Sequence, residues 1–225
     1  MITSHQNQLL KEIRKLNTGK RDGGRFVAEG EDLIAEAEAA GWKPIHLLRA
    51  EQEVSQDALD KVSSLGSGSR VLGVYEEKFA EPVGPLCVAL WGVKDPGNVG
   101  TVIRSALAFG ASSVALGPDT ADPFSPKAVR ASMGAIFRVP VSKVSNVSEL
   151  PGKKIALIAA EGERLSGPVV EDTSIVVGPE RFGIPRSTLA DCDAVAHIPI
   201  QSESLNAAVA ASVALYELTN RLQTA

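Results

Sequence analysis

The sequence has few of the residues that cross-link small domains or bind metals. Only two cysteines, Cys87 and Cys192, occur among 225 residues, which excludes a disulfide framework and a cysteine zinc site. The three histidines, His5, His46 and His197, are scattered, and no Gly-x-Ser-x-Gly segment occurs, so a hydrolase triad has no support. We therefore expect no metal, and this cysteine usage indicates a reducing cytoplasm.

Long apolar runs are missing as well. No stretch reaches the roughly 20 residues that a membrane-spanning helix needs, and the start of the chain is polar and lacks the apolar segment of a signal peptide. No Gly-x-Gly-x-x-Gly follows a predicted strand, and the Walker phosphate loop is absent. The sequence thus indicates no membrane association, and it gives no support to a dinucleotide site or a P-loop NTPase.

Apolar residues make up 44% of the chain, enough for a core, and they alternate between strand-like and helical patterns. In the first part the patterns predict strands at 26–28, 45–48 and 71–75 and helices at 4–17, 31–40 and 55–65. In the second part they predict strands at 86–91, 113–116, 155–158, 175–177 and 194–198 and helices at 99–109, 127–133, 185–191 and 205–222. Strands rich in Val, Ile and Leu between helices favour an α/β fold with a mostly parallel sheet.

The segment 77–85 contains two prolines and a glycine and predicts a linker. It would separate a small N-terminal α/β domain, residues 1–76, from a larger C-terminal domain, residues 86–225. No internal repeat is present. We expect the larger domain to carry the chemistry, since ligands of parallel sheets bind beyond the carboxyl ends of the strands.

Positive charge is concentrated in two segments, although the chain as a whole has a net charge of −4. Residues 1–25 hold six basic and two acidic residues, and residues 123–148 hold four basic residues and no acidic one. Such patches can bind phosphates locally, but charge alone equally fits an ordinary solvated surface.

Three loops at the predicted strand ends are chemically distinctive. The first, 94–111, passes from a strand through Asp-Pro-Gly into a helix, for which Asn98 is the predicted N-cap. Arg104 lies away from the apolar stripe of that helix. The second loop, 178–185, has two glycines and two prolines, and the third, 198–206, leads into an alanine-rich helix. All three would converge at one edge of one sheet.

Each loop also has a purely structural interpretation. The glycines of the first loop can simply shape a turn, and Asn98, Ser204 and Asn206 can simply cap helices, which is the usual task of such residues. Glu180 and Arg181 can form a surface ion pair. The three loops together are harder to explain in this way.

At these loops the chain resembles the SpoU, or TrmH, family of RNA ribose 2′-O-methyltransferases, within the SPOUT superfamily. The family's motifs are matched in order by Asn98-x-Gly100-x-x-x-Arg104, by Gly178-x-Glu180-x-x-Gly183, and by Ile198-Pro199 with Ser204-Leu205-Asn206. The resemblance covers about residues 86–222. A weaker one, over residues 5–30, is to the substrate-binding domain often fused in front.

The resemblance implies a trefoil-knotted C-terminal sheet, a homodimer and S-adenosylmethionine as cofactor, with an rRNA substrate preferred over tRNA. It implies that Gly178, Ile198 and Leu205 line the cofactor site. It gives Arg104 the central role at the ribose 2′-hydroxyl, with Asn98 and Glu180 orienting it. The pocket would be completed by Ser204 and Asn206.

An arginine keeps its proton in proteins, so stabilising a developing alkoxide or a phosphate is physically easier for Arg104 than acting as a base. The candidates for contacts with the RNA backbone come from the two basic segments and are Lys20, Arg21, Arg25, Lys127 and Arg130.

The chain departs from the family pattern at a few positions. Pro179 and Phe182 occupy second-motif positions often held by small or charged residues, and the stretch between Ile198-Pro199 and Ser204 is short. Two other hypotheses stay open: an RNA-binding module without catalysis, and an enzyme acting on a small nucleotide. The complete set of motif residues favours the active enzyme over the first, and the separate basic N-terminal domain argues against the second.

Overall fold

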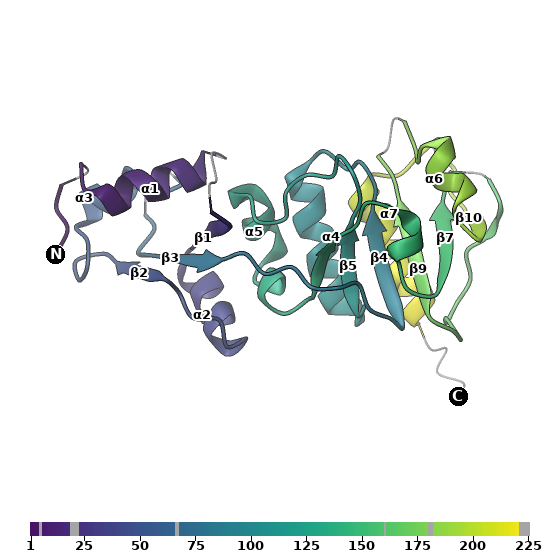
Figure 1. The fold of residues 1–225 in the computed structure, drawn as a ribbon, viewed down its shortest axis with the longest axis horizontal. Coiled ribbons are helices and arrows are strands. Elements are labelled where there is room, and N and C mark those ends of the chain that lie inside the picture. The colour runs from purple at the N-terminus through teal and green to yellow at the C-terminus, as the bar shows by residue number, and fades with distance from the viewer. Residues whose placement is uncertain (5, 19–22, 66–67, 160, 180–181, 221–225) are drawn as a thin grey trace.

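The computed structural model describes residues 1–4, 6–18, 23–65, 68–159, 161–179 and 182–220. Its N-terminal part is a small α/β unit, at the left of Figure 1. The elements of this unit are α1 (Gln8–Asn17), β1 (Arg25–Glu29), α2 (Glu31–Ala39), β2 (His46–Arg49), α3 (Gln56–Asp60) and β3 (Val71–Glu76). Helix α1 begins later than predicted because Asn7 caps it, accepting a hydrogen bond from the Leu9 N–H.

The N-terminal sheet has the strand order β1-β3-β2 and is antiparallel throughout. Alternate residues of its strands point to opposite faces. One face packs against α1 and α3 in a core of its own, which includes Val27, Leu72 and Val74. The other face carries Phe26, Ala28 and Tyr75, which belong to the core of the C-terminal part. The unit is therefore buried on both sides of its sheet.

The C-terminal part is a seven-stranded sheet in the order β6-β5-β4-β9-β7-β10-β8, with every strand pair parallel. The strands are β4 (Leu86–Leu90), β5 (Ser113–Leu116), β6 (Val141–Lys143), β7 (Lys153–Leu157), β8 (Glu163–Arg164), β9 (Thr173–Val177) and β10 (Ala194–His197). The helices are α4 (Pro96–Phe109), α5 (Pro126–Ser132), α6 (Arg186–Ala190) and α7 (Ala207–Thr219), with short 3-10 turns η1 (Ala135–Phe137) and η2 (Val147–Glu149).

Helices cover both faces of this sheet. On one face, Val88 and Ile175 pack with residues of α4, α5 and α7. On the other, Ala89 and Val176 pack with residues around η2 and α6. The central strands β4 and β9 are buried along their whole length, which explains the apolar runs Leu86–Leu90 and 175–177 in the sequence.

An aromatic cluster joins the two parts of the chain. The Phe26 ring lies 4.8 Å from Phe124 and 5.9 Å from Phe137, between ring centroids. The Trp42 indole N–H donates a hydrogen bond of 2.8 Å to the carbonyl oxygen of Phe137. Helix α5 lies between the two sheets in Figure 1 and contacts β1. The N-terminal unit is thus docked on the larger sheet as well as connected to it by residues 77–85.

The predicted α/β fold with a mostly parallel sheet is confirmed. The sequence patterns missed β6 and β8, and α3 is shorter than the predicted helix over 55–65. In the part of the chain that the structure describes, no helix combines the length and apolar character needed to cross a membrane.

Candidate active site

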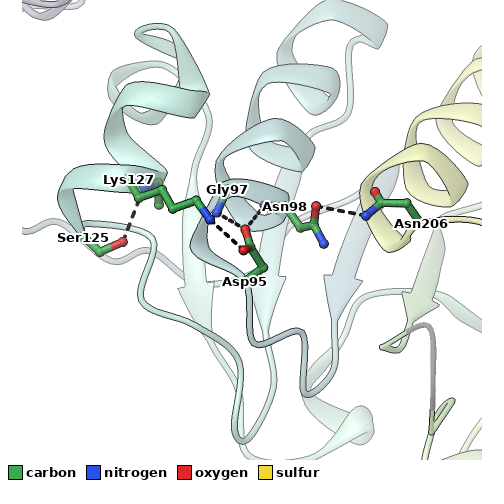
Figure 2. Close-up of polar contacts among 7 residues, drawn as sticks. Asp95, Gly97, Asn98, Ser125, Lys127 and Asn206 are labelled. Carbon is green, nitrogen blue, oxygen red and sulfur yellow. Dashed lines mark hydrogen bonds and ion pairs between the residues drawn. The ribbon is translucent and has the colours of Figure 1, made fainter.

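Three helices, α4, α5 and α7, begin beyond the carboxyl ends of parallel strands. A side chain caps the first turn of each: Asp95 for α4, Ser125 for α5 and Asn206 for α7 (Figure 2). Parallel strands end at one edge of their sheet, so this arrangement brings the first and third motif loops together. The predicted convergence of these two loops is confirmed.

Asp95, not Asn98, is the N-cap of α4, so our sequence prediction for Asn98 was wrong. One carboxylate oxygen of Asp95 accepts hydrogen bonds from the N–H groups of Gly97 at 2.6 Å and Asn98 at 3.1 Å. Pro96 takes the first helical position, where its missing N–H leaves no bond unmade. Asn98 therefore sits inside the first turn, and its side-chain amide is not needed for capping.

Asn98 and Asn206 meet across the two loops. The Asn206 side-chain oxygen caps α7 by accepting from the N–H groups of Ala208 at 2.9 Å and Val209 at 3.3 Å. This capping turns the NH₂ group of Asn206 outward. It donates to the side-chain oxygen of Asn98 at 3.2 Å (Figure 2). Asn206 therefore caps α7 and contacts Asn98 at the same time.

Lys127 of α5 forms an ion pair of 2.7 Å with the second carboxylate oxygen of Asp95. Its hydrogen bond lowers the pKa of Asp95 below the ordinary 3.8, and the bonds from the Asn98 and Gly97 N–H groups act in the same direction. Gly97 leaves room for this pair, since a Cβ there would lie 3.0 Å from the Lys127 Cε atom. One carboxylate thus connects α5 to the turn that holds Asn98.

Gly100 has a packing role. A Cβ at this position would clash with the Ala128 carbonyl oxygen and would lie 2.8 Å from the Ala131 Cβ atom. Gly100 lies in helix α4 rather than in a turn, and it lets α4 and α5 approach closely. The first motif therefore combines a residue for packing, Gly100, with residues that face the site.

Arg104 lies on the exposed surface of α4, nearly two turns beyond Asn98. Among the described residues, no ion pair or hydrogen bond of its guanidinium is found. The next residue, Ser105, bonds Ser212 of α7 through their hydroxyl oxygens at 2.7 Å. This bond fixes α4 against α7, while Arg104 remains accessible to a ligand.

The three predicted cofactor residues line one cavity. Gly178, Ile198 and Leu205 surround it together with Ser204, beyond the carboxyl ends of β7, β9 and β10. Its other walls are mainly aliphatic and include Leu157, Ile158, Val177, Ile200, Ala207 and Ala210. Gly178 is packed tightly, because a Cβ there would lie 2.9 Å from backbone atoms of Gly183 and Ile184. Arg104 does not line this cavity.

The predicted RNA-binding cations do not form one group. Arg25 is paired with Glu12, and Lys127 with Asp95. Arg130 is exposed and lies 3.4 Å from the Ser64 hydroxyl, in a hollow between the two parts of the chain. The remaining predicted residues, Lys20, Arg21 and the motif carboxylate Glu180, lie outside the described residues.

No cluster of three or more His, Cys, Asp or Glu side chains suited to a metal is found in the described ranges. Cys87 and Cys192 are both free thiols. Burial raises the pKa of each thiol, and for Cys192 the neighbouring Asp193 and Asp191 raise it further. Both cysteines are therefore poor nucleophiles near neutral pH.

Sequence reasoning missed the part that Asp95 plays. The signal was present, because an aspartate directly before a proline is a good N-cap with a favourable first helical residue. The ion pair with Lys127 spans 32 positions in the sequence, and no local pattern indicates it.

Comparisons with known proteins agree on one family. The model of the "SpoU rRNA Methylase family" matches residues 85–216. A protein of Bacillus subtilis (strain 168) named 23S rRNA (guanosine(2553)-2′-O)-methyltransferase RlmP is 32% identical, over 96% of this chain and 98% of its own length. The 23S rRNA (guanosine-2′-O-)-methyltransferase RlmB of Coxiella burnetii is also 32% identical, over 86% of this chain and 85% of its own.

Solved structures give the same result. The AdoMet-bound rRNA methyltransferase from Sinorhizobium meliloti superposes with a TM-score of 0.86 at 30% identity, covering 96% of this chain and 95% of that one. The SpoU methyltransferase AviRb from Streptomyces viridochromogenes, in complex with AdoMet, gives a TM-score of 0.81 at 25% identity, covering 94% of this chain and 97% of that one. These alignments include both the N-terminal unit and the larger sheet.

Proposed function

The chain belongs to the SpoU rRNA methylase family, and we propose that the meeting point of α4 and α7 beside the Gly178 cavity is its methyl-transfer site. The protein is an S-adenosylmethionine-dependent RNA methyltransferase that acts on a ribose 2′-hydroxyl. The observation that carries the site assignment is the Asn98–Asn206 hydrogen bond. It holds the first motif beside the third, whose Ser204 and Leu205 line the cavity.

The residues of the cavity fit S-adenosylmethionine. Aliphatic walls suit an adenine ring, and the small side chains of Ala207 and Ala210 leave the helix backbone accessible. A Cβ at position 178 would lie too close to backbone atoms of Gly183 and Ile184, so glycine is needed for this part of the cavity wall to pack as it does. When bound, the cofactor supplies a methyl group on a positively charged sulfur. We propose that Gly178, Ile198 and Leu205 hold it.

The reaction requires a ribose oxygen held in line with the methyl group and stabilised as it loses its proton. Asn98 and Asn206, fixed to each other and to two helix ends, can orient the ribose with their amides. Arg104 is exposed on the same helix as Asn98, and we propose that its guanidinium stabilises the developing oxyanion or an adjacent phosphate. Ser204 and Glu180 complete the proposed set.

We propose ribosomal RNA as the substrate. The names of the RlmP and RlmB relatives specify a guanosine in 23S rRNA, and both align with most of this chain. Lys127 and Arg130 are exposed near the site and are the proposed backbone contacts in the described residues, with Arg25 further away on β1. Lys20 and Arg21 remain candidates from the same N-terminal segment. We keep the cytoplasm as the proposed compartment, which two free thiols support.

A homodimer formed through α7 is part of the proposal. Val209, Val213 and Tyr216 recur at helical spacing and are 47%, 38% and 53% exposed, so α7 presents an apolar stripe to solvent. The Tyr216 ring contacts Phe109 of α4, with centroids 6.0 Å apart, and extends the stripe onto that helix. Light scattering should give twice the chain mass, and a Val213→Asp variant should be monomeric. A wild-type monomer at micromolar concentration would contradict this.

The trefoil knot and the domain limits also remain proposals. The insertion of β9 between β4 and β7 supports a knotted path through residues 86–225. The knot would be contradicted by an experimental structure in which the backbone, pulled from its two ends, straightens without forming a knot. We retain residues 1–76 as an RNA-binding domain and 77–85 as its linker, supported by the separate sheet and core of that unit.

Two measurements test the proposed function. A calorimetric titration with S-adenosylmethionine should show binding, and it should be lost in a Gly178→Val variant that fills the cavity wall. Tritium should then pass from labelled cofactor to 23S or 16S rRNA transcripts and not to tRNA transcripts. Cofactor binding without transfer to any RNA would favour a binding module, and transfer to tRNA alone would contradict the proposed substrate.

A further inference from the structure

A second hollow adjoins the cofactor cavity. Pro179 and Gly183 line both, so these two residues lie between them. The hollow has a volume of about 440 Å³, which is within the range of small-ligand sites. Nothing in the proposed methyl-transfer site uses it.

Phe182 lies next to Gly183 and lines the second hollow. Its side chain is 89% exposed, the largest exposure of any aromatic residue in the described part of the chain. The turn beneath it is closed by a 3.0 Å hydrogen bond from the Gly183 N–H to the Pro179 carbonyl, and Ile184 anchors its end in the core. An exposed aromatic ring can serve as a platform on which a nucleobase stacks.

The rest of the hollow is polar and carries negative charge. Asp119 and Asp191 line it with the amide of Asn146, and the edge of the mostly buried Trp91 is also exposed there. Among the described lining residues there is no lysine or arginine. Carboxylates accept hydrogen bonds and repel phosphate, so this chemistry fits a ligand edge rich in N–H donors.

Asp119 lies at the exposed edge of the hollow. Its backbone has a φ of +62°, a conformation that aspartate adopts more readily than most residues. Its carboxylate is 3.5 Å from the Lys94 ammonium, in a pair whose side chains are 83% and 70% exposed, so it stays accessible to a ligand.

We propose that this hollow binds a nucleobase of the RNA substrate, stacked on Phe182 and hydrogen-bonded through its N–H groups to Asp119 or Asp191. The inference rests on the proposed function for the presence of RNA at this edge. Unpaired bases in RNA are recognised by stacking on an aromatic ring and by bonds to the base edge. Guanine, which presents two adjacent N–H groups, suits the carboxylates best.

The test compares Phe182→Ala and Phe182→Tyr with wild type and with Val170→Ala, a control that truncates a 95% exposed side chain elsewhere. Binding to 23S and 16S rRNA transcripts is measured by filter retention, and cofactor binding by calorimetry. We expect Phe182→Ala to weaken RNA binding about tenfold, the scale of one lost base stack. Phe182→Tyr and Val170→Ala should match wild type, and cofactor affinity should not change.

The chemistry of the base edge is tested with free nucleosides as probes. Saturation-transfer NMR should show guanosine bound more strongly than uridine, and Asp119→Asn with Asp191→Asn should remove this preference. Unchanged RNA binding in Phe182→Ala would overturn the proposal. A loss of cofactor affinity with normal RNA affinity would also overturn it, because the hollow would then belong to the cofactor.

The result can be separated from that of the methyl-transfer assay. If wild type transfers no methyl group but Phe182→Ala still weakens RNA binding, the proposed function fails and the base site stands. If transfer is normal and Phe182→Ala changes neither RNA affinity nor the KM for RNA, the base site fails and the proposed function stands.

Discussion

The two sheets of this protein bury their residues in different ways. The seven-stranded sheet is parallel and covered by its own helices on both faces. The three-stranded sheet is antiparallel and has α1 and α3 on one face, while Phe26 and Tyr75 on the other face pack with α2 and with the core of the larger part. The smaller sheet therefore shares the core on one of its faces with the larger part, whereas the larger sheet is covered by its own helices on both faces.

This difference indicates that the two sheets have different roles. The parallel sheet gathers loops at one edge, which allows residues far apart in sequence to form a site. The antiparallel sheet has no such edge. The aromatic cluster holds this sheet at a fixed place beside α5. We infer that substitutions in the larger sheet's loops affect chemistry. Substitutions at the joint, the aromatic cluster around Phe26 that connects the two parts of the chain, affect stability.

The largest expected effect is on chemistry. Arg104→Ala should lower methyl transfer by about 100- to 1,000-fold, the scale for removing a group that stabilises a developing oxyanion. Cofactor affinity and melting temperature should stay at wild-type values, since the side chain is exposed and does not line the cofactor cavity. Lys153→Ala is the control, because it removes an exposed cation at the start of β7, the opposite edge of the sheet. Near-normal turnover in Arg104→Ala would remove this residue from the site.

The next effect is on the joint. Phe26 is fully buried among four aromatic rings, so Phe26→Ala should lower the free energy of unfolding by about 3–5 kcal/mol. Val27→Ala, on the opposite face of the same strand, is the comparison, and it should cost about 1–3 kcal/mol. Urea denaturation measures both. A smaller effect for Phe26 than for Val27 would mean that the N-terminal unit is tethered rather than docked.

Local patterns in the sequence were enough to predict most of the larger sheet. The buried strand Leu86–Leu90 is a continuous apolar run, and α4 follows a 3.6-residue period, so the positions of both could be predicted directly from the sequence. Strand β8 could not, because it is the two charged residues Glu163 and Arg164 at the sheet edge. The aromatic joint could not either, since it connects rings from distant segments.

For the site, the motif loops were predictable and their contacts were not. Gly178, Ile198 and Leu205 share one cavity, and Asn98 meets Asn206. The latter contact spans 108 positions, and only the parallel sheet creates it. Helix spacing placed Arg104 off the apolar stripe, and the Asp95-Pro96 pair was a sequence signal for the cap that the prediction of Asn98 overlooked.

A smaller effect is expected at the helix cap. Asp95→Ala should lower the free energy of unfolding by about 1 kcal/mol through the lost N-cap, and Asp95→Asn, which keeps a capping oxygen, by only a few tenths. The pKa of Asp95 is lowered in the folded protein, so its charge stabilises the fold fully above the ordinary pKa of 3.8, and this contribution is lost as the pH falls through the lower pKa of the folded state. The difference between wild type and Asp95→Asn should therefore shrink as the pH falls below about 4. Thermal unfolding at pH 7 and pH 3.5 measures it, and an unchanged difference at pH 3.5 would exclude the carboxylate charge as its cause.

The smallest effect on stability, and the most informative one for RNA, is expected at Lys127. Its pair with Asp95 is exposed, so Lys127→Ala should change the free energy of unfolding by less than about 1 kcal/mol. If Lys127 exchanges the carboxylate for an RNA phosphate, the slope of log K against log salt for rRNA binding should fall by about one. Lys61→Ala, which breaks a similarly exposed pair with Asp57 in the N-terminal unit, is the matched control and should leave the slope unchanged. Equal slopes for wild type and Lys127→Ala would mean that Lys127 stays with Asp95, where it supports the turn that holds Asn98 and takes no part in binding the RNA backbone.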